Sequence, residues 1–494
     1  MTRTVIVWGT SSGAGKSFVA TALCRLAARR GFDVAPFKAQ NMSNNARVVA
    51  RHDGQAGEIG SAQYFQALAA RVLPNTDHNP VLLKPERDTA SQVVLHGRVE
   101  PALARLPWRE RSPLLAVAAH EAWRRLAARH ALIVVEGAGS PAEINLADAD
   151  YVNLGTARWA QASGPTAALL VTDIDRGGAF AHVHGTAALL PPDLRSLLAG
   201  YVLNRFRGDA ALLAPGPAQI EALTGLPLAG VLPMARDHGL PEEDGLFDAP
   251  ARGAPAAAAR LRVVVLAPPH ISNLDEFAPL ARVPGLRLGW AHEAAELEGA
   301  DWIVLPGSKQ VSGDLAWLRA RGLEAALHRH AAAGGALLGV CGGLQMLGRT
   351  LHDPEGHDGE CFDTIPGIGL LPLATRFGAH KRLAEGPVAF GAASGAWAPL
   401  AGLVTTGYQI RCGQTQAEGA RSVLHDGNGQ PIGWQQGNVL GVYAHGLFEQ
   451  PAVLQALLGA GARSLDDSFD GLADLIEAHL DPAWLARLLG PVNP

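Results

Sequence analysis

Cysteine is scarce in this sequence: only four of its 494 residues are cysteines, Cys24, Cys341, Cys361 and Cys412. Four cysteines so far apart cannot form the disulfide framework of a small secreted domain, and none of them lies in a CxxC metal-binding pair. The chemical role that stays open for one of them is that of a nucleophile.

Long apolar runs are missing as well. No stretch approaches the roughly 20 apolar residues that a membrane-spanning helix needs. Met1 is followed almost at once by a short strand-like run rather than by a signal-peptide pattern. We therefore expect a cytoplasmic protein with no membrane partner.

An excess of positive charge is also absent. The chain has 41 Lys and Arg against 46 Asp and Glu, which gives a formal net charge of −5. This balance provides no electrostatic footprint for nucleic acid or for an anionic membrane surface. We expect small-molecule partners and no nucleic acid, and the sequence leaves a homo-oligomer open.

The chain is instead well supplied with residues for large buried cores. It is 48% hydrophobic and 18% charged, as globular proteins are, and its length exceeds what one core organises. One stretch, PARGAPAAAAR at 250–260, is rich in Pro, Gly and Ala and lacks bulky apolar residues, as linkers do. We predict one domain over 1–248, a linker over 249–260 and a second domain over 261–494.

Both domains have the pattern of α/β proteins. Short apolar runs without polar alternation, typical of strands buried on both faces of a parallel sheet, alternate with helical patterns. The runs cover 5–8, 33–37, 131–137, 167–175, 200–204 and 227–233, then 261–269, 301–309, 335–343 and 438–446. The sequence therefore predicts two doubly wound sheets.

Polar residues follow the strands of the first domain. Ligands gather at the carboxyl ends of the strands in open α/β sheets. We therefore expect one site lined by Lys38, Glu136, Asp173, Asp175 and Asn204.

The stretch GTSSGAGKS, residues 9–17, lies between the first predicted strand and an amphipathic helix. Its glycines allow a turn that points backbone N–H groups at phosphate oxygens, with the helix N-terminus behind them. This predicts a P-loop for ATP, formed by Gly13, Gly15, Lys16 and Ser17. Lys16 would reach the β- and γ-phosphates, and the Ser17 hydroxyl would ligate Mg²⁺.

Magnesium needs further hard oxygen ligands. Asp53, in DGQAGEIG, and Glu136, at the end of its strand, are the candidates. The alternative for either residue is a helix cap or a surface carboxylate.

Gly9 stands one residue earlier than the usual G-x-x-x-x-G-K-[ST] pattern requires. The resulting spacing resembles the loop of the dethiobiotin synthetase superfamily, whose members use ATP to activate carboxyl or carbamate groups. The order of the following motifs resembles that of the cobyric acid synthases, which amidate the side chains of the corrin ring. These motifs are PFKAQNMSNN, DGQAGEIGSAQ, NPVLLKP, VEGAGSPAEINL, DIDRGG and LNRFRGD.

The second domain contains GVCGGLQMLG, which places Cys341 between a predicted strand and a helix, with glycines on both sides. This pattern indicates a nucleophile elbow, in which a tight turn exposes the sulfur at a helix N-terminus. A lone cysteine is more often a core residue, but the flanking glycines favour the elbow. His445, in VYAHG, would complete a Cys–His pair as base and then acid.

This half of the chain resembles class I glutamine amidotransferases. The resemblance implies an oxyanion hole formed by backbone N–H groups at Gly307, in LPGSK, and at Gly342. Most class I enzymes have an acid two residues after the histidine, where this chain has Leu447. We therefore expect a catalytic dyad of Cys341 and His445.

The segment GYQIRCG, residues 407–413, departs from the pattern of its relatives. Gln409 and Arg411 replace an acid and a histidine. One interpretation is that glutamine binding or its coupling to synthesis is altered. The other is that the segment is a strand with tolerant side chains.

The resemblance to the cobyric acid synthases also implies roles for residues of the first domain. Asp53 and Glu136 would complete the metal shell, and Asn204 would contact adenine. The residues expected near the acyl phosphate and the corrinoid carboxylates are Lys38, Gln40, Asn41, Asp173 and Arg176. The alternative for the arginine is an ordinary surface residue.

The function implied is that of a glutamine-hydrolysing amide ligase of cobalamin biosynthesis. It would use ATP and Mg²⁺ to amidate four carboxylates (b, d, e and g) of a cobyrinic acid a,c-diamide through acyl phosphates. The alternatives are the sister enzyme that forms the a,c-diamide, or another glutamine-dependent carboxylate amidase-ligase. A more distant one is a nucleotide-gated regulatory protein with an inactive amidotransferase domain.

Overall fold

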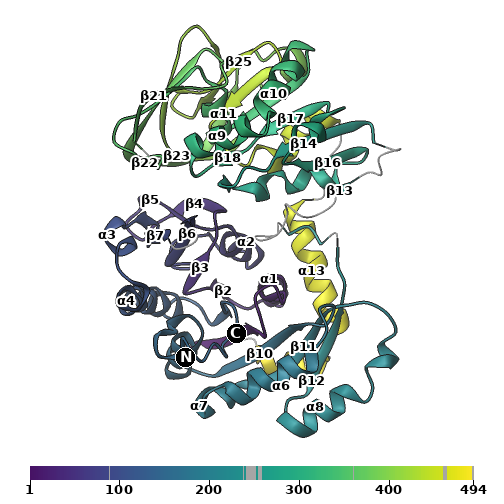
Figure 1. Ribbon diagram of the computed structural model, residues 1–494. Helices are drawn as coiled ribbons and strands as arrows, with labels where there is room; N and C mark the ends of the chain where they lie inside the picture. The colour runs from purple at the N-terminus through teal and green to yellow at the C-terminus, as the bar shows by residue number, and fades with distance from the viewer. Residues whose placement is uncertain are drawn as a thin grey trace. The chain divides into compact units, whose positions relative to one another are not determined.

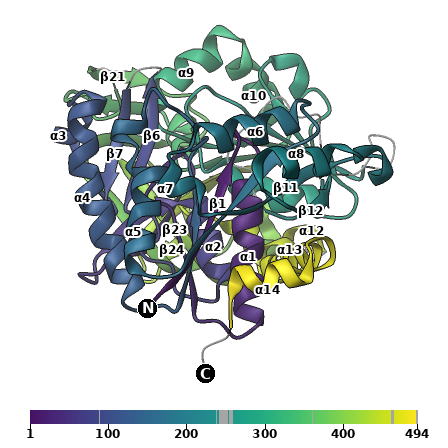
Figure 2. The ribbon, with the colours of Figure 1, turned by 90° about the horizontal axis from the view of Figure 1, so that it is seen from below.

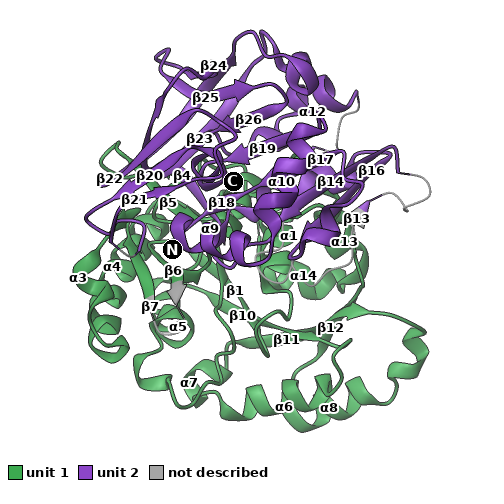
Figure 3. Cartoon of the chain, turned by 45° about the horizontal axis from the view of Figure 1, so that its top comes forward, with its two compact units in different colours: residues 1–43, 49–240, 465–494 green, residues 44–48, 241–464 purple. Residues whose placement is uncertain are grey.

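The computed structural model describes residues 1–87, 90–236, 238–240, 252–253, 259–359, 361–459 and 464–491. The chain divides into two compact units (Figure 3). Unit 1 contains residues 1–43, 49–240 and 465–494, and unit 2 contains residues 44–48 and 241–464. No helix in the described part of the chain is both long and apolar enough to cross a membrane.

Unit 1 is built on a six-stranded sheet in the order β12-β11-β10-β1-β9-β2. Figure 1 labels β2, β10, β11 and β12 of this sheet. All neighbouring strands in it are parallel. Its strands are β1 (Arg3–Gly9), β2 (Val34–Phe37), β9 (Leu132–Glu136), β10 (Thr166–Asp173), β11 (Leu198–Phe206) and β12 (Leu228–Pro233). The six apolar runs predicted for this domain are these six strands.

Both faces of this sheet are covered, as the sequence predicts. Ile6 and Trp8 of β1 belong to a core shared with α4 (Trp108–Ala127), α5 (Thr156–Ser163) and α6 (Ala179–Leu189). Val5 and Val7 point to the other face, where the core includes α1 (Lys16–Arg29) and α2 (Ser61–Ala69). The sheet is therefore doubly wound, and the carboxyl ends of its strands lie at one edge.

The C-terminal helices α13 (Leu465–His479) and α14 (Pro482–Leu489) complete unit 1 (Figure 2). The buried Arg25 of α1 pairs with Asp466 at 3.0 Å and with Asp470 at 2.8 Å. The indole nitrogen of Trp484 donates to the carbonyl of Ala199 at 2.8 Å. Residues 465–494, which the sequence analysis placed in the 261–494 domain, therefore belong to unit 1, whereas the rest of that domain belongs to unit 2. Most of the predicted 249–260 linker lies outside the described residues.

Smaller elements complete unit 1. A four-stranded sheet has the order β3-β6-β7-β8. The remaining strands and helices are β3 (Gln40–Met42), β4 (Ala46–Ala50), β5 (Ala56–Gly60), β6 (Val81–Arg87), β7 (Ala90–Leu95), β8 (Arg98–Val99), α3 (Pro101–Ala104), α7 (Pro192–Arg195) and α8 (Gly216–Thr224). The first three residues of β4 cluster with unit 2 rather than unit 1.

Unit 2 contains a twelve-stranded sheet whose parallel part has the order β16-β14-β17-β19-β26. Numbered along the chain, this is the order 2-1-3-4-5 of flavodoxin-like folds, which confirms the predicted fold class. These strands are β14 (Leu261–Leu266), β16 (Leu286–Ala291), β17 (Trp302–Leu305), β19 (Ala336–Val340) and β26 (Val439–Val442).

The rest of the sheet was not predicted. From β26 the sheet continues in the order β25-β24-β22-β20-β21, and β23 also pairs with β22. Neighbouring strands of this extension are antiparallel, except β20 and β22, which are parallel. Its strands are β20 (Thr350–Asp353), β21 (Phe362–Pro366), β22 (Leu373–Phe390), β23 (Val404–Ala417), β24 (Arg421–Asp426) and β25 (Pro431–Gln436). The other elements of unit 2 are β13 (Arg252–Gly253), β15 (Ile271–Ser272), β18 (Gly307–Ser308), α9 (Val311–Ala320), α10 (Leu323–Ala332), α11 (Gly342–Leu347) and α12 (Pro451–Leu458).

Candidate active site

The predicted P-loop joins the end of β1 to the start of α1. Gly15 is the N-cap residue of α1 and has a φ of 101°, a conformation that glycine adopts without strain. The amine of Lys16 donates to the carbonyl oxygens of Ser11 and Gly139, each at 2.9 Å. The loop is thus closed around the lysine amine, at the N-terminus of the helix.

The unusual position of Gly9 has a structural reason. A Cβ atom at this position would lie 3.0 Å from Cγ, Cδ and Nζ of Lys16, which is tighter than ordinary contact. The lysine side chain therefore lies directly over Gly9, and a residue without a side chain leaves room for it.

Glu136 is the centre of a buried polar cluster beside this loop. Its Oε1 accepts from the Ser17 hydroxyl at 2.8 Å and from the Lys38 amine at 2.7 Å. Its Oε2 accepts from the side-chain amides of Gln63 at 3.3 Å and Gln66 at 2.5 Å. Burial opposes ionisation, but Lys38 and the other donors outweigh it and hold the pKa of Glu136 below its usual value.

The structure thus brings together Ser17, Lys38 and Glu136 as the sequence predicts, and it adds two glutamines. Gln63 and Gln66 lie three residues apart on α2, so they share one face of the helix. Gln63 belongs to the motif DGQAGEIGSAQ, but its type alone gave no signal of a bond to Glu136.

Asp53 is not brought into this cluster. Its carboxylate pairs with Arg51 at 2.8 Å and with Arg98 at 3.6 Å. Within the described residues, no group of three or more His, Cys, Asp or Glu side chains is arranged to hold a metal. The metal role of Asp53 stays a prediction that this geometry does not support.

Asn204 lies against the P-loop. Its side-chain amide donates to the carbonyl of Ala14 at 2.9 Å, and the residue is buried in the last part of β11. A Cβ on Gly15 would come within 2.0 Å of this amide nitrogen. In this structure Asn204 braces the loop, and its contact with adenine stays a prediction.

The remaining predicted substrate residues of unit 1 have local partners. The Tyr151 hydroxyl donates to Oε1 of Gln40 at 2.7 Å, and the buried Asn41 accepts from the backbone N–H of Met42. Asp173 pairs with Arg205 at 2.9 Å and with the exposed Arg176 at 3.3 Å. A Cβ on Gly13 would lie 3.2 Å from Arg176, which places that guanidinium at the P-loop.

Cys341 occupies a strained turn between β19 and α11. Its φ of 49° and ψ of −102° are rare for a residue with a side chain. The next two glycines are required by packing, because a Cβ on Gly342 would meet the backbone nitrogen of Ser308 at 2.6 Å and one on Gly343 the carbonyl oxygen of Leu305 at 2.0 Å. This is the geometry of a nucleophile elbow.

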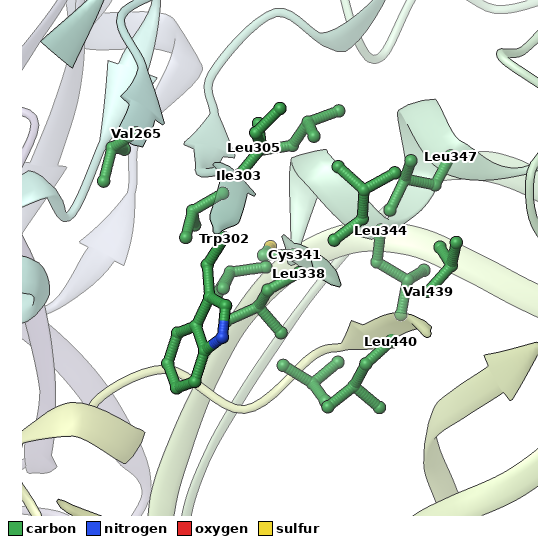
Figure 4. Close-up of a cluster of buried hydrophobic side chains, with 14 of the residues drawn as sticks. Val265, Trp302, Ile303, Leu305, Leu338, Cys341, Leu344, Leu347, Val439 and Leu440 are labelled. Atoms are coloured by element: carbon green, nitrogen blue, oxygen red, sulfur yellow. The ribbon is translucent and has the colours of Figure 1, made fainter. Parts of the chain in front are cut away.

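The elbow is held by the apolar core of unit 2. Figure 4 shows Cys341 beside Leu338, with Leu344 and Leu347 of α11 close to the strand residues. The backbone N–H of Cys341 donates to the carbonyl of Val442 at 2.8 Å, which ties the elbow to β26. The sulfur is 3.5 Å from the carbonyl oxygen of Ile410.

His445 lies close enough to Cys341 for the cysteine to raise the pKa of the imidazole, so the predicted pair is assembled. The Nδ1 atom of His445 lies 2.8 Å from Oε1 of Glu276, and the backbone N–H of Gly446 donates to Oε2 at 2.9 Å. Burial lowers the pKa of His445, but Glu276 and Cys341 outweigh it and raise this pKa to about 10. The imidazole is therefore held protonated at neutral pH, between a carboxylate and a sulfur.

The expectation of a dyad without a carboxylate was wrong. The acid comes from the 3-10 helix η5 (Leu274–Arg282), 169 residues before the histidine, instead of two residues after it. Leu447, at the expected place, is a buried apolar residue. The only signal for Glu276 in the sequence is its place in the loop that follows β14, whose carboxyl end lies at the same sheet edge as the elbow.

The predicted oxyanion residues also lie at this site. A Cβ on Gly307 would be 3.2 Å from Cε1 of His445, and Gly342 is the residue after the nucleophile. The loop that carries Gly307 is fixed by the hydroxyl of Ser308, which donates to the buried Asp314 at 2.6 Å. Gly307 therefore lies beside His445, and Gly342 directly follows Cys341.

Comparison with known proteins finds one family domain over each of the two parts of the chain. A family model described as the CobQ/CobB/MinD/ParA nucleotide binding domain matches residues 5–251, and one described as the CobB/CobQ-like glutamine amidotransferase domain matches residues 262–453. A cobyric acid synthase from Leptothrix cholodnii is 60% identical over 100% of this chain and 98% of its own length. The chain belongs to the cobyric acid synthase family. This confirms the family and the type of enzyme, a glutamine amidotransferase ligase, that the motifs indicate.

Other relatives repeat this result. A cobyric acid synthase from Methylibium petroleiphilum is 59% identical over 100% of this chain and 98% of its own. A solved structure titled "Crystal structure of glutamine amidotransferase" covers 44% of this chain and 98% of its own at 20% identity, and its TM-score of 0.30 is too low to support a conclusion.

In this member of the cobyric acid synthase family, the segment GYQIRCG forms part of β23 and lines the site. Its Ile410 carbonyl is the acceptor of the Cys341 thiol, and the ring of Tyr408 stacks on His445 with centroids 5.2 Å apart. Gln409 is buried, and its side chain accepts from Arg411 at 3.1 Å. The two departures from the family pattern therefore bond to each other, beside the catalytic pair.

Proposed function

We propose that this protein uses ATP and glutamine to amidate the b, d, e and g carboxylates of a cobyrinic acid a,c-diamide, giving cobyric acid. The observation that carries the proposal is the presence of two assembled sites in one member of this family. One is the P-loop with Lys38 and Glu136, and the other is Cys341 with His445 and Glu276.

The glutaminase half-reaction follows from the geometry at Cys341. The sulfur attacks the carboxamide carbon of glutamine, and the N–H groups at Gly307 and Gly342 stabilise the oxyanion that forms. The proton of the Cys341–His445 pair lies on His445, which is held by Glu276. His445 gives this proton to the leaving nitrogen, which departs as NH₃. Water then cleaves the thioester, giving glutamate and restoring the thiol.

The ligase half-reaction takes place at the P-loop. A carboxylate does not accept an amine, because its oxygen is a poor leaving group. The carboxylate oxygen therefore attacks the γ-phosphorus of ATP, ADP leaves, and an acyl phosphate forms. Lys16 and Lys38 offset the negative charge that develops during this transfer. Ammonia then attacks the carbonyl carbon, phosphate leaves with the C–O bond electrons, and an amide remains after loss of a proton.

Ammonia must reach this carbon without a proton, because ammonium has no lone pair. Release of NH₃ at the buried Cys341–His445 site supplies the uncharged form, and apolar surroundings disfavour its protonation. This is the physical reason for joining the two activities in one chain.

Magnesium would be held by Ser17 and Glu136. Both offer hard oxygen atoms, which Mg²⁺ prefers, and the lowered pKa of Glu136 keeps its carboxylate ionised. The ion would neutralise charge on the β- and γ-phosphates. Asp53 is left out of this set because its partners are arginines.

For the corrinoid and the acyl phosphate we propose Lys38, Gln40, Asn41, Asp173 and Arg176. The cluster of Asp173, Arg176 and Arg205 at the P-loop offers guanidinium groups that suit a polyanionic ring. A cytoplasmic location and a homo-oligomeric state remain predictions from the sequence.

The test is the product formed by the purified protein. With the a,c-diamide, ATP, Mg²⁺ and glutamine, we expect masses that correspond to four successive amidations. Addition of only two amides to fully acidic cobyrinic acid would instead assign the activity of the sister enzyme.

A further inference from the structure

Residues 44–48 come from the N-terminal half of the chain but cluster with unit 2. Two reciprocal hydrogen bonds attach this segment to the start of η5. The side-chain oxygen of Asn45 accepts from the N–H of Leu274 at 3.0 Å, and that of Asn273 accepts from the N–H of Ala46 at 3.0 Å. All four residues are buried. The segment therefore fixes the turn that carries Glu276.

Arg47 adds a buried charge to this attachment. It is 2% exposed and pairs with Asp275, the residue next to Glu276, and with Glu449 at 2.6 Å and 3.0 Å. Burial raises the pKa of Glu449 to about 7 even though Arg47 opposes the shift. The guanidinium is thus the positively charged partner of two buried carboxyl groups beside the catalytic acid.

The same guanidinium reaches the histidine by a second route. Its Cζ lies 5.0 Å from the centroid of the Tyr408 ring, whose other neighbour is His445, stacked at an interplanar angle of 21°. The backbones of Tyr408 and His445 also exchange two hydrogen bonds, of 2.8 Å and 3.2 Å. His445 has two neighbours that Arg47 supports. Arg47 contacts the ring of Tyr408 directly, and it supports Glu276 through the adjacent Asp275.

We propose that Arg47 is a positioning residue for glutamine hydrolysis, which holds Glu276 and Tyr408 in the arrangement that orients His445. The proposal rests on the glutaminase role assigned above. It gives an unexpected result: Arg47 lies within the 5–251 stretch that matches the nucleotide binding domain, yet it serves the chemistry at Cys341.

The test compares variants with two nitrogen sources. For Arg47→Met we expect the kcat of glutaminase to fall on the order of 10- to 100-fold, since small misplacements of a catalytic group have such effects. The KM for glutamine and the ATP-dependent synthesis from ammonia should change less than about twofold. Arg47→Lys, which keeps the charge, should recover part of the lost kcat. The matched control is Arg382→Met. Arg382 also forms an ion pair, with Asp426, but its side chain is 45% exposed instead of buried.

Two results would overturn the proposal. The first is that the glutaminase kcat of Arg47→Met stays within twofold of the parent value. The second is that glutaminase and ammonia-dependent synthesis fall by the same factor in Arg47→Met, which would make Arg47 a structural residue only. If Arg47→Met does not fold, Glu449→Gln tests the same cluster with the same readouts. Cys341→Ala is measured in parallel. If this variant still uses glutamine, the proposed glutaminase site is wrong. If Cys341→Ala loses glutamine use while Arg47→Met keeps the glutaminase kcat of the parent, the glutaminase site stands and only the role of Arg47 is refuted.

Discussion

The imidazole of His445 lies 2.8 Å from the carboxylate of Glu276, although the two residues are 169 positions apart in the chain. The carboxylate holds the ring by Nδ1, which leaves Nε2 for the chemistry at Cys341. Its negative charge also stabilises the imidazolium form of His445 beside Cys341. The same division of labour operates in Ser-His-Asp hydrolases.

Glu276→Gln should therefore lower glutamine-dependent synthesis by up to about 10⁴-fold, the effect of replacing the acid of a Ser-His-Asp triad by its amide. Synthesis from ammonium salts should persist, because the ligase site does not use this residue. Steady-state rates with the two nitrogen sources measure both. Unchanged glutamine use would show that Glu276 is only a buried partner of the ring.

Stability should depend on pH through the same pair. The pKa of His445 rises from 6.5 to about 10, because Glu276 and Cys341 outweigh the opposing effect of burial. A group whose pKa is higher in the folded chain contributes stability that is complete below the unfolded pKa and is lost as the pH rises through the folded pKa. The excess free energy of unfolding of the parent over Glu276→Gln should thus shrink between pH 6.5 and about 10. Denaturant titrations at several pH values measure it, and a constant difference would contradict the shift.

Cys341→Ser and Lys16→Ala should separate the two half-reactions. The serine variant loses glutamine use but keeps ammonia-dependent amidation, because the P-loop is untouched. The alanine variant loses synthesis with either nitrogen source, because no acyl phosphate forms. Product analysis by mass spectrometry distinguishes them. Retained synthesis in Lys16→Ala would remove the P-loop from the mechanism.

Glu136 and Asp53 provide a matched pair of carboxylates. Glu136→Gln should lower synthesis from both nitrogen sources on the order of 10²-fold or more, since an ionised oxygen at the phosphate site is lost. Asp53→Asn should have a much smaller effect, because Asp53 is paired with Arg51 and Arg98. Titrations of activity against Mg²⁺ concentration measure both variants. An equal loss in Asp53→Asn would restore the metal role that the sequence indicates.

Much of the fold could be predicted from local pattern. Uninterrupted apolar runs such as 131–137 and 335–343 identified parallel strands, because both faces of these strands are buried. The antiparallel extension of unit 2 was missed because its strands alternate polar and apolar residues; β22, for example, alternates between buried and exposed positions. The return of α13 to unit 1 depends on Arg25, whose partners are more than 400 residues away in the chain.

The candidate site divides in the same way. The P-loop and the cysteine elbow are short motifs, so the sequence located Lys16 and Cys341 without a structure. Glu276, Gln66 and Arg47 act through partners that are distant in sequence, and nothing in their immediate neighbours distinguishes them from surface residues. Asp53 is the opposite case, since its motif indicated a ligand and its side chain bonds to arginines.

The central claim is that nitrogen released at Cys341 is the nitrogen that the P-loop site attaches to the corrinoid. Synthesis from glutamine labelled with ¹⁵N in its side-chain amide, in the presence of excess unlabelled ammonium, tests this most directly. We predict that mass spectrometry will find ¹⁵N in the new amide groups. New amides that carry only unlabelled nitrogen would contradict the claim.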